Sequence, residues 1–91
     1  MYKIISSSSF KKSLKRYKNN QRLISRIKET LECLKSNNKL PVKYKEHELK
    51  GSYANFLECH ICPDLLLIYR RIKTEKLIVL HNIGSHSYLF K

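Results

Sequence analysis

The stretch FLECHICPDLLLIYRRIKTEKLIVLHNI, residues 56–83, carries most of the information about the fold. Residues 56–61, 65–71 and 77–83 are short runs rich in Leu, Ile, Val and Tyr, a composition typical of β-strands. The polar segment IKTEK, residues 72–76, separates the last two runs and is typical of a hairpin turn. We therefore expect a mainly antiparallel sheet in this half of the chain, with a face that other elements must cover.

A short strand and a helix are predicted before this sheet. Residues 2–5, YKII, have the composition of a short strand. The serines at positions 6–9 offer hydroxyl groups that can cap the start of a helix. Phe10, Leu14 and Tyr17 then recur at i, i+4 and i+7, which places them on one face of that helix.

A second amphipathic helix is predicted between two breaks in the pattern. Asn19-Asn20 permits a break before it, and Asn37-Asn38 with Pro41 ends it. Its apolar stripe consists of Ile24, Ile27, Leu31 and Leu34. The expected order is strand, helix, helix, strand, strand, strand and a short tail. Two helices packed on one face of the sheet bury both stripes, so we expect a single α+β domain over residues 1–91.

Charge is the strongest global feature of the sequence. Nineteen Lys and Arg residues against seven Asp and Glu give a net charge of +12, and residues 1–50 hold fourteen of the basic residues against four Glu. This exceeds the charge that a small domain needs for solubility, which is the alternative interpretation. Such a field attracts polyanions, which indicates nucleic acid or an acidic protein as the partner.

Several features predict a cytoplasmic protein. No apolar run approaches the roughly 18 residues that a membrane span needs, and the longest strongly apolar stretch is LLLIY, residues 65–69. The start, MYKIISSSS, lacks the pattern of a signal peptide. Three cysteines are an odd number for a disulfide framework and fit a reducing compartment better.

The segment ECHICPD, residues 58–64, has two interpretations: a metal-binding Cys-x-x-Cys pair, or a functional histidine. On an extended strand Glu58 and His60 point to one face, while Cys59 points with its apolar neighbours to the other, where a buried thiol is inert. A zinc site needs about four ligands, usually in two separated pairs. A single Cys-x-x-Cys is therefore weak evidence for metal, and His60 is the better candidate.

Three further histidines differ in their surroundings. His47 lies in a loop between Glu46 and Glu48, and His86 lies in the tail GSHSYLF, where Gly and Ser leave it free to project. His81 has the strand parity of Leu77, Val79 and Ile83, so we expect it at a structural or edge position. His47 and His86 therefore remain candidates for chemistry.

Three separated motifs together resemble the YafQ branch of the RelE/ParE superfamily of bacterial toxins. HELKG at residues 47–51 is similar to the family's His-x-Leu-x-Gly, and ECHICPD is similar to its Glu/Asp-x-His-x-x-Pro-Asp before an apolar strand. GSHSYLF at residues 84–90 is similar to its closing Gly-Ser/Thr-His-x-x-Leu-Phe. The predicted order of elements also matches the RelE-like fold, so the resemblance covers essentially the whole chain.

The resemblance implies an endoribonuclease that cuts mRNA in the ribosomal A site and is held inactive by a cognate antitoxin. It places His47, His60, Asp64 and His86 at the family's acid–base positions, and Phe90 at that of a substrate-holding aromatic. Metal-free cleavage, with no cofactor, needs a base for the 2′-OH and an acid for the departing 5′-oxygen, and histidine can serve as either.

The role of each residue follows from this chemistry as an expectation. We expect His86 to act as the general acid, His60 and Asp64 to act on the base side, and His47 to orient the phosphate. Phe90 can stack on an unpaired base. Structural alternatives are that Asp64 after Pro63 shapes a turn and that Phe90 pins the tail to the core.

The sequence departs from the family pattern at three positions. Leu57 and Asn82 stand where many relatives have Arg, and Tyr88 stands where relatives often carry an acid. A guanidinium at position 82 would stabilise the charge of the phosphorane, whereas Asn brings only a hydrogen bond. The charge could instead come from other cations, and Asn82 is expected at the substrate with Lys45, Lys50 and Arg70.

Two other functions compete with the nuclease. One is a toxin-fold protein without cleavage activity that acts through its antitoxin as a transcriptional co-repressor, which Asn82 favours. The other is a ParE-like gyrase inhibitor, against which the histidines argue. The first expected partner is an acidic antitoxin, partly disordered when free, which forms a heterotetramer with this protein. The other expected partners are the ribosome and its mRNA, and operator DNA only through the antitoxin; no membrane is expected.

Overall fold

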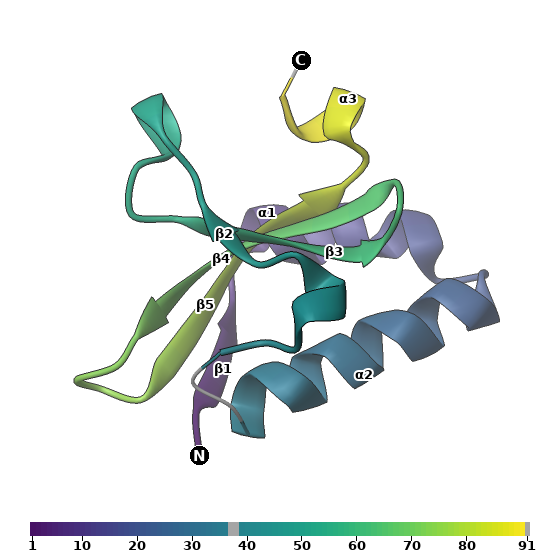
Figure 1. Cartoon of the computed structure of the whole chain (residues 1–91). Helices are drawn as coiled ribbons and strands as arrows, with labels where there is room; N and C mark the ends of the chain where they lie inside the picture. The colour runs from purple at the N-terminus through teal and green to yellow at the C-terminus, as the bar shows by residue number, and fades with distance from the viewer. Residues whose placement is uncertain (37–38, 91) are drawn as a thin grey trace.

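A five-stranded mixed sheet forms the centre of the computed structural model, which describes residues 1–36 and 39–90 (Figure 1). The strands lie in the order β1-β5-β4-β3-β2. β1 runs parallel to β5, and the other three pairs of neighbours are antiparallel. The bounds are β1 Lys3–Ser6, β2 His47–Glu48, β3 Leu57–Cys62, β4 Leu65–Ile72 and β5 Leu77–Gly84.

Helices α1 and α2 pack on one face of this sheet. The helical elements are α1 Ser8–Leu14, η1 Lys15–Tyr17, α2 Gln21–Ser36, η2 Val42–Tyr44, η3 Gly51–Tyr53 and α3 His86–Leu89, where η marks 3₁₀ turns. The predicted α+β class and the order strand, helix, helix, strand, strand, strand are confirmed. The short strand β2 and the tail helix α3 were not predicted.

Side-chain caps define where the two long helices begin. The hydroxyl of Ser7 accepts a hydrogen bond from the Phe10 N–H at 3.0 Å, as the serine run predicts. The Asn20 side-chain oxygen accepts from the Leu23 N–H at 3.1 Å at the start of α2. The predicted end of α2 at Asn37-Asn38 lies outside the described residues.

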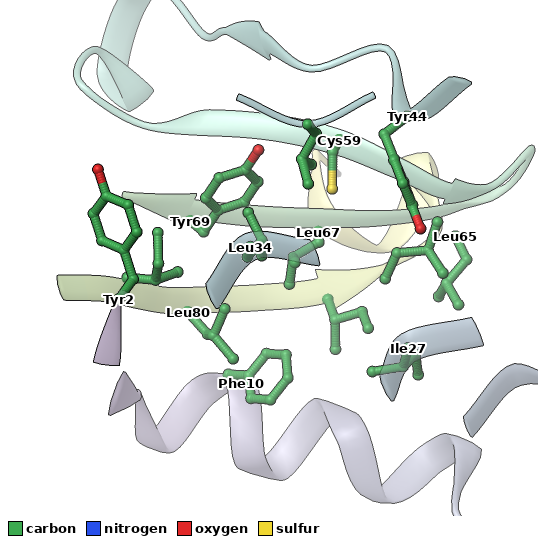
Figure 2. Close-up of a cluster of buried hydrophobic side chains, with 14 residues drawn as sticks. Tyr2, Phe10, Ile27, Leu34, Tyr44, Cys59, Leu65, Leu67, Tyr69 and Leu80 are labelled. Carbon is green, nitrogen blue, oxygen red and sulfur yellow. The ribbon is translucent and has the colours of Figure 1, made fainter. Parts of the chain in front are cut away.

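The main core lies between the helices and the sheet (Figure 2). Phe10 from α1 and Ile27 and Leu34 from α2 meet Leu67 and Leu80 of the sheet there. These helix residues belong to the predicted apolar stripes. The other buried members are Tyr2, Leu40, Tyr44, Cys59, Ile61, Leu65, Tyr69, Ile78 and Ile83.

A second, smaller cluster covers the opposite face of the sheet. Leu66 and Ile68 of β4 and Leu89 of α3 form its buried centre. The partly buried side chains around it are Leu49, Tyr53, Phe56, Tyr88 and Phe90. We call this face of the sheet, opposite α1 and α2, the open face; Figure 1 shows η3 and α3 rising on that side.

Two register shifts change which residues share a face. The ladder between β4 and β5 pairs Ile68 with Asn82 but Tyr69 with Leu80, so His81 is an extra residue in a bulge. Ile83 consequently lies in the main core, whereas the His81 ring meets Phe56 of the second cluster. The expectation that His81 and Ile83 point to the same face of the sheet is therefore wrong. A second shift, after His60, turns Cys62 toward the main core.

None of the helices in the described part of the chain is long and apolar enough to cross a membrane.

Candidate functional site

Two histidines and a glutamate meet at the outer edge of the open face. Nε2 of His47 lies 3.2 Å from Oε1 of Glu58, and Nε2 of His60 lies 3.9 Å from the same oxygen. The two imidazole centroids are 6.4 Å apart. Only 7% of the Glu58 side chain is exposed, against 49% for His47 and 31% for His60. A shielded carboxylate therefore holds two accessible imidazoles.

Strand pairing explains why these residues meet. β2 is only two residues long, but its ladder places His47 directly opposite Glu58. Glu58 and His60 alternate with Cys59 along β3, so they point to the same face, as predicted. Their partners on β4 are Ile68 and Leu66, the centre of the second cluster. The motifs around His47 and His60 are thus brought together at one edge of the open face.

A left-handed turn delivers His47 to this position. Lys45 has a φ of 50° and ends the η2 turn, and its carbonyl oxygen lies 2.9 Å from Nδ1 of His47. A carbonyl can only accept, so Nδ1 is the donor in this contact. Both ring nitrogens of His47 thus face oxygen acceptors.

The tail brings His86 and Phe90 to the opposite edge of the open face. The Ser85 hydroxyl accepts a hydrogen bond from the Tyr88 N–H at 3.1 Å and caps α3. His86 is exposed, and its ring centroid lies 5.0 Å from that of Phe90. The Phe90 ring in turn meets Tyr53 of η3 edge-on at 5.7 Å. An aromatic group therefore adjoins the tail histidine.

The sheet ladder relates the two groups of histidines. His60 pairs with Leu66, and Leu66 pairs with Gly84, which is two residues before His86. Two strand spacings separate His60 from Gly84, a distance of roughly 10 Å. The expected acid and base positions therefore lie on one face, across the width of three strands.

The three cations expected at the substrate lie around this face. Arg70 is exposed on β4, with its guanidinium carbon 5.9 Å from the centroid of Phe56. Lys50 lines a shallow pocket between η3 and the tail, with Tyr53 and Phe90. Lys45 lines another pocket, which it shares with His60 and with Arg26 of α2.

Asp64 and Asn82 are not in contact with the histidines. Asp64 is exposed in the turn between β3 and β4, and its carboxylate has no hydrogen-bond or ion-pair partner within residues 1–36 and 39–90. Burial raises the pKa of the Tyr17 phenol, and the negative charge of Asp64 contributes to this shift, so Asp64 lies near Tyr17. The Asn82 side chain instead accepts hydrogen bonds from Ser13 and from the Ile83 N–H.

Glu58 is the site residue that the sequence analysis did not select. Strand parity places it beside His60, yet a buried carboxylate becomes informative only when a second histidine is known to lie opposite. That histidine comes from β2, a strand too short to leave a pattern in the sequence. The Glu-x-His spacing was the available signal.

The Cys-x-x-Cys pair supports the interpretation of an inert thiol. Cys59 is fully buried in the main core, and burial raises the pKa of its thiol far above the ordinary value. Leu57 also packs against that core. Within the described residues, no group of three or more His, Cys, Asp or Glu side chains could hold a metal ion.

Comparisons with known proteins agree with this geometry. The family model described as the bacterial toxin YafQ of type II toxin–antitoxin systems matches residues 2–91. The chain belongs to the YafQ family. The mRNA interferase toxin YafQ of Escherichia coli K12 is 32% identical to it over 85 residues, covering 92% of this chain and 90% of the relative.

Solved structures of the family have the same fold. The crystal structure of YafQ from E. coli BL21(DE3) covers 100% of both chains with a TM-score of 0.88 and 27% identity. YafQ in the E. coli DinJ–YafQ toxin–antitoxin complex matches with a TM-score of 0.86 and 28% identity, covering 99% of this chain and 98% of that one. The predicted membership of the family and the RelE-like fold are thus confirmed.

Proposed function

We propose that this YafQ-family protein is an mRNA interferase, an endoribonuclease toxin that cuts mRNA on the ribosome and is held inactive by an antitoxin. The observation that carries the proposal is the pairing of His47 and His60 around Glu58, on the same face of the sheet as His86. The E. coli relative that matches over most of its length is an mRNA interferase.

The reaction requires proton transfer at two oxygens. A base removes the proton of the 2′-OH, the 2′-oxygen attacks phosphorus, and the bond between phosphorus and the 5′-oxygen breaks. An acid then supplies the proton to the 5′-oxygen, which leaves a 2′,3′-cyclic phosphate on the upstream fragment. Imidazole serves both steps near neutral pH. We place the RNA strand across the open face, between His60 and His86.

We assign His86 as the general acid, because it is exposed and lies beside Phe90. His60 and Asp64 act on the base side, and His47 orients the phosphate. The Glu58 carboxylate lies beside the His47 and His60 rings and orients them toward the substrate. Asp64 is exposed in the turn that follows β3, so a bound substrate can reach its carboxylate.

Substrate contacts come from the groups around the open face. Phe90 offers a ring on which an unpaired base can stack, worth roughly 1–3 kcal/mol per base. Lys45, Lys50 and Arg70 supply positive charge for the backbone phosphates, in place of a guanidinium at position 82. The Asn82 carbonyl oxygen is occupied by Ser13, so any contact of Asn82 with substrate is left to its amide N–H groups.

The partners follow from the family and from charge. A complex of an E. coli relative with the antitoxin DinJ supports an antitoxin as partner. A net charge of +12 favours an acidic antitoxin and helps the free toxin to dock on ribosomal RNA. We propose a heterotetramer with the antitoxin, which alone carries the contact with operator DNA.

Primer extension on a reporter mRNA in a reconstituted translation system tests this function, with and without ribosomes. We expect discrete cuts that require ribosomes. His86→Ala should weaken them by about a hundredfold or more, the contribution typical of a general acid. Ser87→Ala, which changes the next residue of the same helix, should cut as the wild type does.

The absence of cuts from folded wild-type protein would contradict the nuclease function. The transcriptional co-repressor would then be the better assignment, and Asn82→Arg would be the variant to test for recovered cleavage.

A further inference from the structure

The helix that carries His86 is too short to hold its own conformation. α3 has four residues, His86–Leu89, and one side-chain cap at Ser85. An isolated helix of one turn is unstable in water, because nucleation fixes several dihedrals for a single hydrogen bond. The position of His86 must therefore be set by tertiary contacts of the tail.

Tyr88 makes one of these contacts, with Gly84 at the end of β5. A Cβ atom built on Gly84 would lie 2.4 Å from Cδ2 of the Tyr88 ring, far inside van der Waals contact. Only glycine therefore lets the ring lie against the strand at this point. The Arg16 guanidinium of η1 stacks on the same ring, with its carbon 4.3 Å from the centroid.

A hydrogen-bonded chain continues from Tyr88 to the helix on the other face of the sheet. The Ser13 hydroxyl of α1 donates to Oδ1 of Asn82 at 2.6 Å, and the Tyr88 hydroxyl lies 3.0 Å from the same Ser13 oxygen. Because the single proton of Ser13 is already donated to Asn82, Tyr88 is the donor to Ser13. The chain therefore runs in one direction, from Tyr88 through Ser13 to Asn82.

This chain of hydrogen bonds is fixed at its Asn82 end. Oδ1 of Asn82 also accepts from the Ile83 N–H at 2.9 Å, which fixes the orientation of the side-chain amide. Ser13 is only 3% exposed, so loss of Asn82 would leave its buried O–H without an acceptor, and loss of the Tyr88 hydroxyl would remove the hydrogen bond that the Ser13 oxygen accepts. β1 pairs with β5 only up to Leu80, which leaves the edge of β5 open for this contact between the tail and α1.

We propose that Tyr88 is a positioning residue for His86: the chain Tyr88–Ser13–Asn82 ties α3 to α1 and holds the histidine and Phe90 at the edge of the open face. The proposal rests on the function proposed above, in which His86 is the acid. It also gives Asn82 a role that requires no charge, and it connects two of the three positions at which the sequence departs from the family pattern.

Two substitutions break this chain of hydrogen bonds with little change in the shape of the side chains. Tyr88→Phe removes only the donor hydroxyl, and Ser13→Ala removes its acceptor. Ser87→Ala removes an exposed hydroxyl from the same helix and serves as the matched control. Gly84→Ala displaces the Tyr88 ring without removing the hydroxyl, and so tests the same contact independently. Thermal unfolding of each variant shows that the protein is folded.

The first readout does not depend on cleavage. With ¹⁵N-labelled protein, we expect backbone relaxation of residues 85–89 and the imidazole signals of His86 to show increased mobility in Tyr88→Phe, Ser13→Ala and Gly84→Ala, but not in Ser87→Ala. Unchanged relaxation and imidazole signals in Tyr88→Phe and Ser13→Ala would overturn the proposal.

The second readout is single-turnover cleavage on programmed ribosomes, measured as a function of toxin concentration. We expect Tyr88→Phe to lower the maximal rate by about tenfold, because small displacements of a catalytic group are costly, while the half-saturating concentration stays constant. The double variant Ser13→Ala/Tyr88→Phe should be no slower than either single variant, since both break one chain. Fully additive losses would overturn the proposal.

The two readouts separate this proposal from the function on which it rests. Increased mobility of His86 in a protein that never cuts RNA would support the positioning role and reject the nuclease. Normal cleavage with unchanged His86 signals in Tyr88→Phe would support the nuclease and reject the positioning role.

Discussion

The carboxylate of Glu58 lies between two imidazoles and is almost fully shielded from water. It is 3.2 Å from Nε2 of His47 and 3.9 Å from Nε2 of His60, and no more than 7% of its side chain is exposed. Away from water, interactions between charged groups are less screened than at the surface. Glu58 is therefore the buried charged group that faces both histidines of the site.

Glu58→Gln should slow cleavage while leaving the fold intact. A hydrogen bond to a charged group contributes about 1.5–3 kcal/mol, so we expect a loss of roughly tenfold to a hundredfold in the maximal rate. The measurement is single-turnover cleavage on programmed ribosomes. Glu48→Gln is the matched control, because Glu48 is exposed on β2 and lies opposite Leu57, whereas the ion pairs of His47 and His60 are with Glu58. Equal rates for the wild type and Glu58→Gln would show that the carboxylate has no part in the chemistry.

At the scale of single residues, the sequence predicted which face of the sheet a side chain points to better than it predicted which side chains touch. The alternation of Cys59 and His60 between the two faces followed from the strand pattern alone. The strand pattern did not predict the faces of His81 and Ile83 correctly, because a bulge at His81 inserts one residue and reverses the alternation beyond it. The partner of Tyr88 was equally hidden, since Ser13 is 75 positions away in the sequence.

The segment before β2 is held to β4 by a buried ionic network. Oε2 of Glu46 lies 2.8 Å from Nη1 of Arg71 and accepts a short hydrogen bond from the Tyr69 hydroxyl. Its other oxygen accepts from the Leu40 N–H at 3.0 Å. Within the described residues, Nε and Nη2 of Arg71 have no hydrogen-bond partner. Glu46 is therefore the counter-charge on which the buried guanidinium depends.

Glu46→Gln should destabilise the protein by about 3 kcal/mol or more at pH 7, since it leaves a buried cation unpaired. Burial acts to raise the pKa of Glu46, but the hydrogen bonds from Tyr69 and Leu40 and the charge of Arg71 outweigh it and lower the pKa below the ordinary 4.5. The unfolded chain thus takes up the proton first. The stabilisation that the ionised Glu46 contributes to the folded protein is therefore fully present above about pH 4.5. It is lost as the pH falls through the lower pKa that Glu46 has in the folded protein.

Urea unfolding at pH 7 and pH 3 measures this difference in the free energy of unfolding. We expect the gap between the wild type and Glu46→Gln to be smaller at pH 3. Glu75→Gln, in the exposed turn between β4 and β5, should match the wild type at both values. A gap that stays constant with pH would mean that the carboxylate acts through packing and not through its charge.

Helices and strands long enough to show a repeating hydrophobic pattern were predicted from the sequence, and shorter ones were not. The stripes of α1 and α2 and the apolar runs of β3, β4 and β5 repeat long enough to be recognised. β2 has two residues and α3 has four, so neither completes a recognisable repeat. Both carry site histidines, which is why the residues of the site could be named before their arrangement was known.

Across the whole molecule, eight of the nineteen basic residues lie exposed along the helices. Exposed cations follow α1, η1 and α2 without a break: Lys11, Lys12, Lys15, Arg16, Lys18, Arg22, Arg26 and Lys28. The open face adds Lys45, Lys50 and Arg70. A field of this size acts over about 10 Å at moderate ionic strength, so it steers an approaching polyanion before contact.

Association with an acidic antitoxin should therefore be fast and sensitive to salt. We expect the association rate constant, measured by stopped flow, to fall by about tenfold or more between 50 and 500 mM salt, because ions screen the steering field. The dissociation rate should change far less, since it depends on the short-range contacts of the complex. Replacing Lys11, Lys12 and Lys28 by Gln lowers the net charge from +12 to +9 and should flatten the salt dependence. An association rate constant that does not change across the salt series would show that the positive charge does not steer the antitoxin. Binding of the charged surface to ribosomal RNA would then be the interaction to test.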